Sequence, residues 1–567
     1  MIQMISIILL LFYVYVCTIC AKSIVKTKNG PVSGKTIELF NTKVTEYLGI
    51  PFAKPPIGDL RFKSPQPLDE PAWHETFNAD KPANACLQGV NMKGFEGMDF
   101  FVKKKEQSED CLQLNMWVPQ KPNGAVLVFI FGGGFRFGSP SLDIYNGSVL
   151  AAKTRTIVVN LNYRLGIFGL AYMCCGTDVQ GNMALLDQQM GMRWVFRNIK
   201  SFKGDPNRIT LWGHGAGSAS ATAHLYAKQS HKYFKRIIAG SGVITNIWAR
   251  NYPQRVDDSV RIGSFAYGCQ RNHHDIYECL KKLNDSDLLS ISEKFSKQSD
   301  APFTYGINIV TKDNVFFQGN IEEKIETKNM KTDVDIMIGM TSNEGSFFLP
   351  TLKDHELFGC AKNDSILFQY KEKTCKMKKK DFNLFYKYFT NTLNCNITET
   401  EILKRFYYQK DCIKDYRKCA LKFLADVAFD CDILQFARMC AFKIDGYIYF
   451  YILDVTSSLL KFPKWVKSVH GAEIEYAFGL PFRQPRLYDK KLLTKAKRFS
   501  DKLMKIIGRF AKSGKPGYKW NKFNPYNMKA AKLDFSIIWK KKIKHIKKSI
   551  TTRCKMINKY TSKYITH

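Results

Sequence analysis

The stretch Trp212-Gly213-His214-Gly215-Ala216-Gly217 has the residue types and spacing that most directly suggest chemistry. An apolar run, residues 208–211, precedes it, and a run of small residues, 218–223, follows it. The pattern predicts a strand, a tight glycine turn and a helix. This is the layout of a nucleophile elbow, G-x-S-x-G, in which a sharp turn holds a serine above a sheet. The nucleophile position here is Gly215, which has no side chain and therefore cannot form an acyl-enzyme.

Two other interpretations of the same stretch are weaker. Ser218 lies one helical turn after Gly215 and is in principle a substitute nucleophile. A serine on a helix lacks the fixed exposure of an elbow, however, and its distance from the donors that stabilise an oxyanion is wrong. The glycines of residues 213–217 are also similar to a phosphate loop, but the lysine and the dinucleotide spacing are missing.

Predicted strands and helices alternate on both sides of this turn. Strands are predicted at residues 125–131, 156–163, 234–242, 333–339 and 445–452, and helices at 185–200 and through much of the chain after Asp257. Alternation of this kind favours a doubly wound α/β sheet. Because no internal repeat or low-complexity linker interrupts it, we expect a single domain over residues 22–567, with a basic C-terminal tail.

The chain of 567 residues carries a formal net charge of +36, from 86 Lys and Arg against 50 Asp and Glu. A field of this sign favours anionic partners, such as acidic glycans, nucleic acid, acidic proteins or anionic lipid, and argues against a site that attracts cations. The alternative is a lysine-rich bias spread over a solvated surface. The lysines between Lys540 and Lys548 are the most concentrated, and form either a binding patch or a solvated helix face.

Residues 1–21 have the pattern of a secretory signal peptide. Residues 5–16 are apolar, small residues follow at Thr18, Cys20 and Ala21, and the first charge is Lys22. The run is short for a membrane span, although an uncleaved anchor is the alternative. We therefore expect a secreted, extracellular protein in which most of the remaining fourteen of the sixteen cysteines form disulfides. Candidate glycosylation sequons begin at Asn146, Asn284, Asn363 and Asn396.

Several segments, in order and at consistent spacing, resemble the cholinesterase/carboxylesterase type B family. They are residues 47–56, 108–115, 131–135, 138–147, 160–169, 181–206 and 463–481, and the resemblance extends from about Ile24 to about Cys554. Residues 142–147 and 462–481 look most like cholinesterases. The resemblance implies an α/β-hydrolase fold, with a large, mostly parallel, twisted central sheet flanked by helices, and a Ser-Glu-His triad. It implies no cofactor and no metal.

Two of the three triad residues are found at matching motifs. Glu344, in Asn343-Glu344-Gly345, resembles the triad acid, and His470, in Val469-His470-Gly471, resembles the triad base. The glycine pair Gly133 and Gly134 and the backbone N–H of Ala216 resemble the oxyanion hole of the family. The residue before the nucleophile is usually a glutamate in cholinesterases and is His214 here, which suggests relaxed constraint on the site rather than a relocated mechanism.

The ligand-binding residues of the family are only partly kept. Phe101 stands where the choline-stacking tryptophan is expected, and Trp248, Phe347 and Phe348 match aromatic residues of the binding gorge. Arg136 replaces a tyrosine and would repel a quaternary amine. Each retained aromatic residue has core packing as its alternative role.

The resemblance also implies three disulfides: Cys86–Cys111, Cys269–Cys279 and Cys431–Cys554. It assigns no partner to Cys174, Cys175, Cys360, Cys375, Cys395, Cys412, Cys419 or Cys440. A further bridge among Cys360, Cys375, Cys395, Cys412 and Cys419 is an open option, because connectivity cannot be read from a sequence.

Our first hypothesis is a secreted cholinesterase-like pseudoenzyme that binds a small or choline-ester-like ligand, or an anionic glycan or protein partner. One alternative is an active carboxylic ester hydrolase with a non-standard nucleophile or an activated water. Another is a polyanion-binding or adhesion protein on a hydrolase scaffold. A homodimer through a helical segment at residues 534–548 is an additional option, although its charge opposes close packing.

Overall fold

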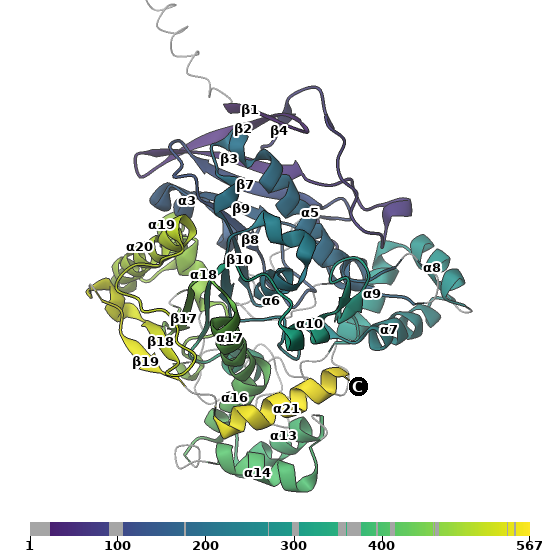
Figure 1. Cartoon of the computed structure of the whole chain (residues 1–567), viewed down its shortest axis with the longest axis vertical. Helices are drawn as coiled ribbons and strands as arrows, with labels where there is room; N and C mark the ends of the chain where they lie inside the picture. Colours follow the sequence, from purple (N-terminus) through teal and green to yellow (C-terminus); the bar gives the residue numbers. More distant parts are fainter. Residues whose placement is uncertain are drawn as a thin grey trace, which may run out of the picture.

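A large sheet runs through the middle of the computed structural model and organises the rest of the chain (Figure 1). The structure describes residues 23–566 except 90–105, 175–176, 178, 270–271, 297–304, 350–358, 360–375, 393–394, 409–413, 458, 460–463, 541 and 549–550. Within these residues the strand order is β1-β2-β3-β7-β9-β8-β10-β11-β16-β17-β18-β19, and β4 pairs with β2. The strands are β1 (Ser23–Thr27), β2 (Gly30–Leu39), β3 (Thr42–Pro51), β4 (Phe77–Asn78), β7 (Gln113–Pro119), β8 (Val126–Ile130), β9 (Ile157–Leu161), β10 (Ile209–His214), β11 (Arg236–Gly240), β16 (Asp335–Thr341), β17 (Ile448–Leu453), β18 (Lys529–Leu533) and β19 (His545–Lys547).

The centre of the sheet is parallel and its two ends are antiparallel. All neighbours from β9 through β8, β10, β11, β16 and β17 to β18 are parallel pairs. Every residue of β8, β9 and β10 is buried, as expected for parallel strands that are covered on both faces. The apolar runs of the sequence therefore become the central strands.

Helices cover both faces of this sheet (Figure 1). In that view, α3 (Ser148–Thr154), α19 (Leu480–Arg483) and α20 (Lys490–Ser513) lie on one side, and α5 (Met183–Asn198) and α6 (Ala216–Ala223) lie on the other. The remaining helices that matter here are α4 (Gly166–Leu170), α7 (Pro253–Phe265), α8 (His273–Lys282), α9 (Asp285–Ser296), α10 (Ile321–Thr327), α11 (Gly345–Phe348), α13 (Lys379–Thr392), α14 (Ile397–Tyr407), α16 (Tyr416–Ala425), α17 (Cys431–Lys443), α18 (Ala472–Ala477) and α21 (Thr552–Thr566). This architecture confirms the expected α/β-hydrolase fold.

The helical segment expected at residues 534–548 is not the C-terminal helix of the structure. Residues 534–548 contain a single short 3₁₀ helix (Phe535–Ile538) and the edge strand β19, so their described lysines do not lie on a helix face. The C-terminal helix is α21, which packs against α14 and α17. Lys547 lies on β19, which pairs with β18, and Lys544 and Lys548 flank that strand, so alternation along a strand replaces the expected helical face.

All three disulfides implied by the resemblance are confirmed: Cys86–Cys111, Cys269–Cys279 and Cys431–Cys554. Cys419 is disulfide-bonded as well, whereas Cys395 and Cys440 are not. Cys175, Cys360, Cys375 and Cys412 lie outside the described residues, as do the signal segment, Phe101 and Asn363. In the portion of the chain that the structure describes, no helix is both long enough and apolar enough to span a membrane.

Candidate active site

The turn between β10 and α6 has the geometry of an elbow. Gly215 has φ 55° and ψ −120°, a conformation that strains residues with a side chain. Its N–H donates to the carbonyl of Gly240 at the end of β11, and its carbonyl accepts from the N–H of Ala219 in the first turn of α6. The neighbouring glycine Gly217 is also required, because a Cβ there would lie 2.0 Å from the carbonyl oxygen of Ile130 on β8.

Glu344 and His470 are brought together beside this turn from positions 126 residues apart in the chain. Nδ1 of His470 lies 2.6 Å from Oε2 of Glu344. The other carboxylate oxygen of Glu344 accepts from the hydroxyl of Ser241 and from the N–H of Thr341, each at 2.6 Å. Burial acts to raise the pKa of Glu344, but the charge and hydrogen bonds of these partners outweigh it, and the pKa is lowered. The carboxylate is therefore ionised at neutral pH and orients the imidazole.

The second imidazole nitrogen faces the elbow. A Cβ placed on Gly215 would lie 3.1 Å from Nε2 of His470. In a serine hydrolase this nitrogen accepts the proton of the nucleophile. Here glycine leaves only backbone at that point, so the acid and base pair faces a position with no reactive side chain.

Two serines of the site, Ser218 and Ser241, are already engaged as hydrogen-bond donors. The hydroxyl of Ser218 donates to the carbonyl of Gly242 at 2.6 Å, and the hydroxyl of Ser241 donates to Glu344. Both serines are fully buried. Their geometry weighs against either hydroxyl as a replacement nucleophile.

The glycine loop after β8 lies against the elbow. A Cβ on Gly132 would lie 2.6 Å from the carbonyl oxygen of His214, so the loop and the turn are in close contact. Gly133 and Gly134 follow with φ 119° and 61°, values that favour glycine. Ala216 begins α6, where a backbone N–H has no partner within the helix. These are the groups that the resemblance assigns to an oxyanion hole.

Aromatic rings surround His470. Its ring centroid lies 5.7 Å from that of Phe347, 5.5 Å from that of Phe348 and 5.1 Å from that of Phe429. Trp248 packs against Phe429, at 5.6 Å between centroids, and its indole N–H donates to the backbone carbonyl of Ala428. The predicted residues Trp248, Phe347 and Phe348 therefore belong to one apolar wall, and Phe429 joins them.

A second histidine and a second glutamate lie behind the first pair. The ring of His214 lies 4.5 Å from that of His470, and its Nε2 is 3.8 Å from Oε1 of Glu473. Among the described residues, neither His214 Nε2 nor the two Glu473 oxygens have a hydrogen-bond partner. Burial, reinforced by the charge of His470, holds the pKa of His214 well below its ordinary value, and burial followed by the charge of Glu344 raises the pKa of Glu473 to about 7. Glu473 is thus protonated and neutral below about pH 7, and the imidazole of His214 is uncharged at neutral pH.

A positively charged side chain, that of Arg136, lies at the glycine loop. The guanidinium of Arg136 stacks on the ring of Tyr305, with Cζ 4.0 Å from the centroid. Its Nη2 would lie 3.4 Å from a Cβ on Gly134. A positive charge at this point disfavours cationic ligands and favours neutral or anionic ones.

Three residues of this site were not expected from the sequence. Phe429 lies on a π-helical turn (Asp426–Asp430) between α16 and α17, and such turns often occur at functional sites. Glu473 follows His470 by three residues, so its proximity to His470 in the sequence was the available signal. Tyr305 has no signal of this kind, because its contact with Arg136 spans segments far apart in the chain.

The three described sequons differ in accessibility. Asn284 and Asn396 are exposed, whereas Asn146 is partly buried and its side-chain oxygen accepts from both the N–H and the hydroxyl of Ser148. Asn284 and Asn396 are therefore the better glycan acceptors.

The parallel sheet, the elbow at Gly215 and the acid–base pair beside it are the parts of an α/β-hydrolase site, present here without the serine. The chain belongs to the carboxylesterase family, whose model matches residues 21–551. It is 34% identical to the cholinesterase of Mus musculus over 507 residues, which cover 87% of this chain and 79% of that protein. It is 33% identical to acetylcholinesterase 4 of Caenorhabditis briggsae over 539 residues (89% and 84%), and 32% identical to the acetylcholinesterase of Bungarus fasciatus over 501 residues (87% and 78%).

Proposed function

We propose that the protein is a secreted, cholinesterase-like pseudoenzyme that binds a ligand at the former active site without turning it over. The observation that carries this proposal is Gly215 in front of Nε2 of His470. In a well-studied serine protease, loss of the nucleophile costs about 10⁶ in rate and leaves roughly 10³–10⁴ over water. The hydroxyls of Ser218 and Ser241 already donate hydrogen bonds within the protein, which also supports a site without a nucleophile.

The surroundings of His470 favour a small ligand that is neutral or anionic. Phe347, Phe348 and Phe429 offer apolar ring faces. Buried His214 is uncharged, and Arg136 supplies a positive charge at the glycine loop. A ligand with an acyl or carboxylate group and an apolar body fits this chemistry better than a quaternary amine, because Arg136 repels a cation.

The test uses the mature chain, expressed with its disulfides intact. We expect no labelling by a fluorophosphonate probe and no hydrolysis of short-chain acyl esters above that of a denatured control. Ester turnover that disappears in His470→Ala would contradict the proposal. It would instead support the alternative of a hydrolase in which His470 activates a water.

A second candidate function is polyanion binding, favoured by the basic surface of α20. Cations of this helix stack on aromatic rings of the C-terminal segments, Arg498 on Trp539 and Lys495 on Phe535. Partial burial and the charges of Lys505 and Arg509 lower the pKa of Lys502. When crowded cations of this kind neutralise a polyanion, the counter-ions condensed on the polyanion are released, which makes binding favourable and salt-dependent.

The candidate patch joins two elements. We define it by the exposed residues Lys495, Arg498, Lys505 and Arg509 of α20 and Lys540, Lys542, Lys544 and Lys547 of the C-terminal hairpin. The stacking of Arg498 on Trp539 holds the two elements side by side, as Figure 1 also shows for α20 and β18–β19. This function is independent of the site at Gly215, so the two proposals are tested separately.

A further inference from the structure

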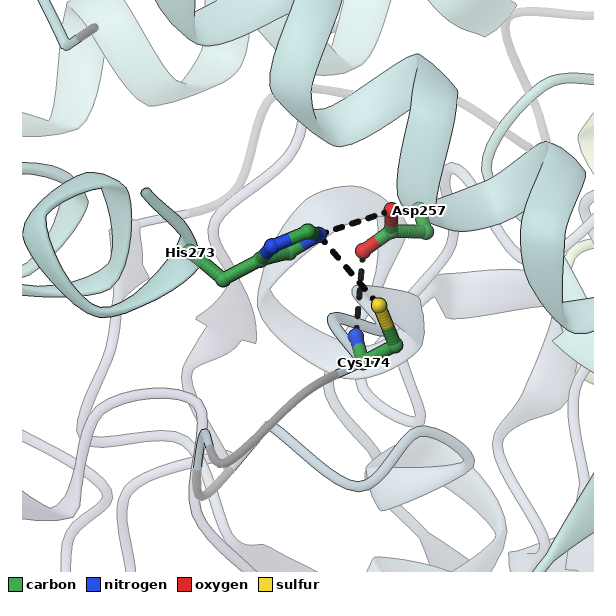
Figure 2. A group of neighbouring side chains, drawn as sticks. All are labelled: Cys174, Asp257 and His273. Atoms are coloured by element: carbon green, nitrogen blue, oxygen red, sulfur yellow. Dashed lines mark hydrogen bonds and ion pairs between the residues drawn. The ribbon is translucent and has the colours of Figure 1, made fainter. Parts of the chain in front are cut away.

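Three side chains with metal-binding chemistry converge at the base of α7, away from Gly215. Figure 2 shows Cys174, which follows α4, Asp257 of α7 and His273, the first residue of α8. The sulfur of Cys174 lies 3.3 Å from Nε2 of His273, and the same nitrogen lies 3.1 Å from Oδ2 of Asp257. One ligand atom from each residue lies within 4.8 Å of the others.

Hydrogen bonding alone accounts poorly for this arrangement. Nε2 of His273 faces a thiol sulfur and a carboxylate oxygen at once, and a single imidazole nitrogen has one N–H or one lone pair. If it donates, it aligns with only one of the two acceptors. If it accepts from the thiol, its lone pair opposes the lone pairs of the carboxylate. The arrangement of these three side chains also differs from a Cys-His-Asp catalytic triad, in which the thiol and the carboxylate contact different nitrogens of the imidazole.

We propose that Cys174, Asp257 and His273 form a site for a divalent transition-metal ion of the zinc class. Thiolate, imidazole and carboxylate are the ligands that Zn²⁺ takes in proteins, in tetrahedral geometry. Bond lengths of about 2.3 Å to sulfur and about 2.1 Å to nitrogen place those two atoms about 3.6 Å apart. The observed 3.3 Å is within a few tenths of this separation, so small movements admit the ion.

The surroundings already position these ligands. Asp257 is 1% exposed, and its other oxygen, Oδ1, accepts from the backbone N–H of Cys174 at 3.0 Å. The Cys269–Cys279 disulfide joins the segment after α7 to α8, which starts at His273. Cys174 and His273 are partly exposed, so an ion reaches the site from solvent, and a water completes the fourth position.

One neighbour opposes the ion. Nε of Arg261 lies 3.3 Å from Oδ2 of Asp257, while its Nη2 lies 2.9 Å from Oδ1 of Asp258. The thiolate and the Asp257 carboxylate together balance a divalent ion, and Asp258 balances Arg261. Metal binding therefore requires Arg261 to shift toward Asp258, to which it already donates.

The amino-acid sequence alone does not indicate this metal site. Cys174 and Asp257 are 83 residues apart, and Asp257 and His273 are 16 apart, which matches no ligand-spacing motif. The fold alone brings them together. A bound ion would link the segment after α4 to the α7–α8 pair. Because the ion binds only the folded chain, it would stabilise that state by mass action.

The experiment measures metal binding by the full mature chain. After removal of metal with a chelator, we expect equilibrium dialysis against Zn²⁺ to return about one ion per chain, and Co²⁺ to give the sulfur-to-cobalt absorption band of a thiolate ligand. We also expect Zn²⁺ to raise the Tm and chelator to lower it. His273→Ala and Cys174→Ser should each reduce the affinity for Zn²⁺ at least tenfold and remove the Tm shift.

The matched control is His274→Ala, which removes the exposed neighbouring histidine on the same helix. It should keep the affinity and the Tm shift of the unmodified chain. Equal loss in His273→Ala and His274→Ala would show adventitious binding and overturn the proposal. So would a cobalt complex without the sulfur band, or peptide mapping that finds Cys174 in a disulfide. If Cys174→Ser does not fold, the cobalt spectrum and the comparison of His273→Ala with His274→Ala still test the proposed site.

Discussion

Within the described part of the chain, a Cβ atom on Gly215 would have His470 as its only contact within 4 Å apart from its chain neighbours, with Nε2 at 3.1 Å and Cε1 at 3.6 Å. The imidazole thus borders the position that a nucleophile side chain would occupy. Because Glu344 holds the other side of that imidazole, the base remains oriented although there is nothing to deprotonate.

Gly215→Ser should create a serine that a fluorophosphonate probe labels, whereas the unmodified chain should stay unlabelled. The new hydroxyl would be adjacent to Nε2 of His470 and to the N–H of Ala216. The substitution places a side chain at φ 55°, ψ −120°, which costs about 1–3 kcal/mol of stability. Labelling is read by gel fluorescence and by mass spectrometry of the peptide that carries residue 215.

Combining Gly215→Ser with His470→Ala is the control, and it should abolish the labelling. Gly215→Ser together with His214→Glu tests whether a carboxylate before the nucleophile improves the reaction. A folded Gly215→Ser chain that never reacts would mean that the donors and the base are no longer aligned.

Glu473→Gln should change how stability depends on pH. The pKa of Glu473 is raised from 4.5 to about 7, chiefly by burial and next by the charge of Glu344. Between these values the unfolded chain has released the proton and the folded chain retains it, so this group stabilises the fold below about pH 4.5 and loses that contribution as the pH rises to about 7. Glutamine does not titrate, so the variant should gain on the order of 3 kcal/mol relative to the unmodified chain across this window.

The measurement is the difference in Tm between the two proteins from pH 4 to pH 8. It should rise through the window and then level off. Glu326→Gln, at an exposed position of α10, is the matched control. A flat difference for Glu473→Gln would show that Glu473 ionises normally.

Asp187→Ala should destabilise the protein by about 3–5 kcal/mol, because it leaves the buried guanidinium of Arg164 without its partner. Arg164 donates to Asp187 through Nε at 2.8 Å and Nη2 at 2.7 Å, and both side chains are almost wholly buried. Urea unfolding at pH 7 measures the change. Asp69→Ala, which breaks an exposed pair with Lys54, should stay within about 1 kcal/mol. An equal loss of stability in the two variants would contradict the conclusion that burial of the Arg164–Asp187 pair makes its disruption costly.

Neutralising the C-terminal half of the basic patch should weaken binding to heparin. Changing Lys540, Lys542, Lys544 and Lys547 to glutamine removes four exposed charges next to α20. We expect elution from a heparin column at clearly lower salt, because fewer counter-ions are released. Four exposed lysines on the opposite end of the sheet and other surfaces, Lys35, Lys43, Lys121 and Lys200, provide a charge-matched control. The same shift in both variants would indicate a net-charge effect without a defined patch.

The sequence predicts the centre of this protein well and its periphery less well. The apolar runs that become β8 and β9 are long and uninterrupted. Such runs are typical of parallel strands that are buried on both faces, as β8 and β9 are. Glu344 and His470 are found because each sits in a short motif. Phe429 is not, because its approach to His470 depends on a π-helical turn and on the packing of α16 and α17.

The error at residues 534–548 has a different physical cause. Lysine has good helix propensity, and a basic run with scattered apolar residues is compatible with a helix when it is considered alone. The edge of the sheet determines the outcome, because β18 offers unpaired backbone groups that β19 satisfies. Tertiary pairing thus overrides local preference at β19.

The Cys431–Cys554 disulfide closes a covalent ring in the chain. His470, on the segment between these cysteines, lies inside the ring, whereas Gly215 and Glu344 lie outside it. A protease that cuts once anywhere between residues 432 and 553 therefore leaves two pieces that remain attached through sulfur. The nicked protein keeps its imidazole-bearing segment tethered to the sheet, and separates into fragments only after reduction.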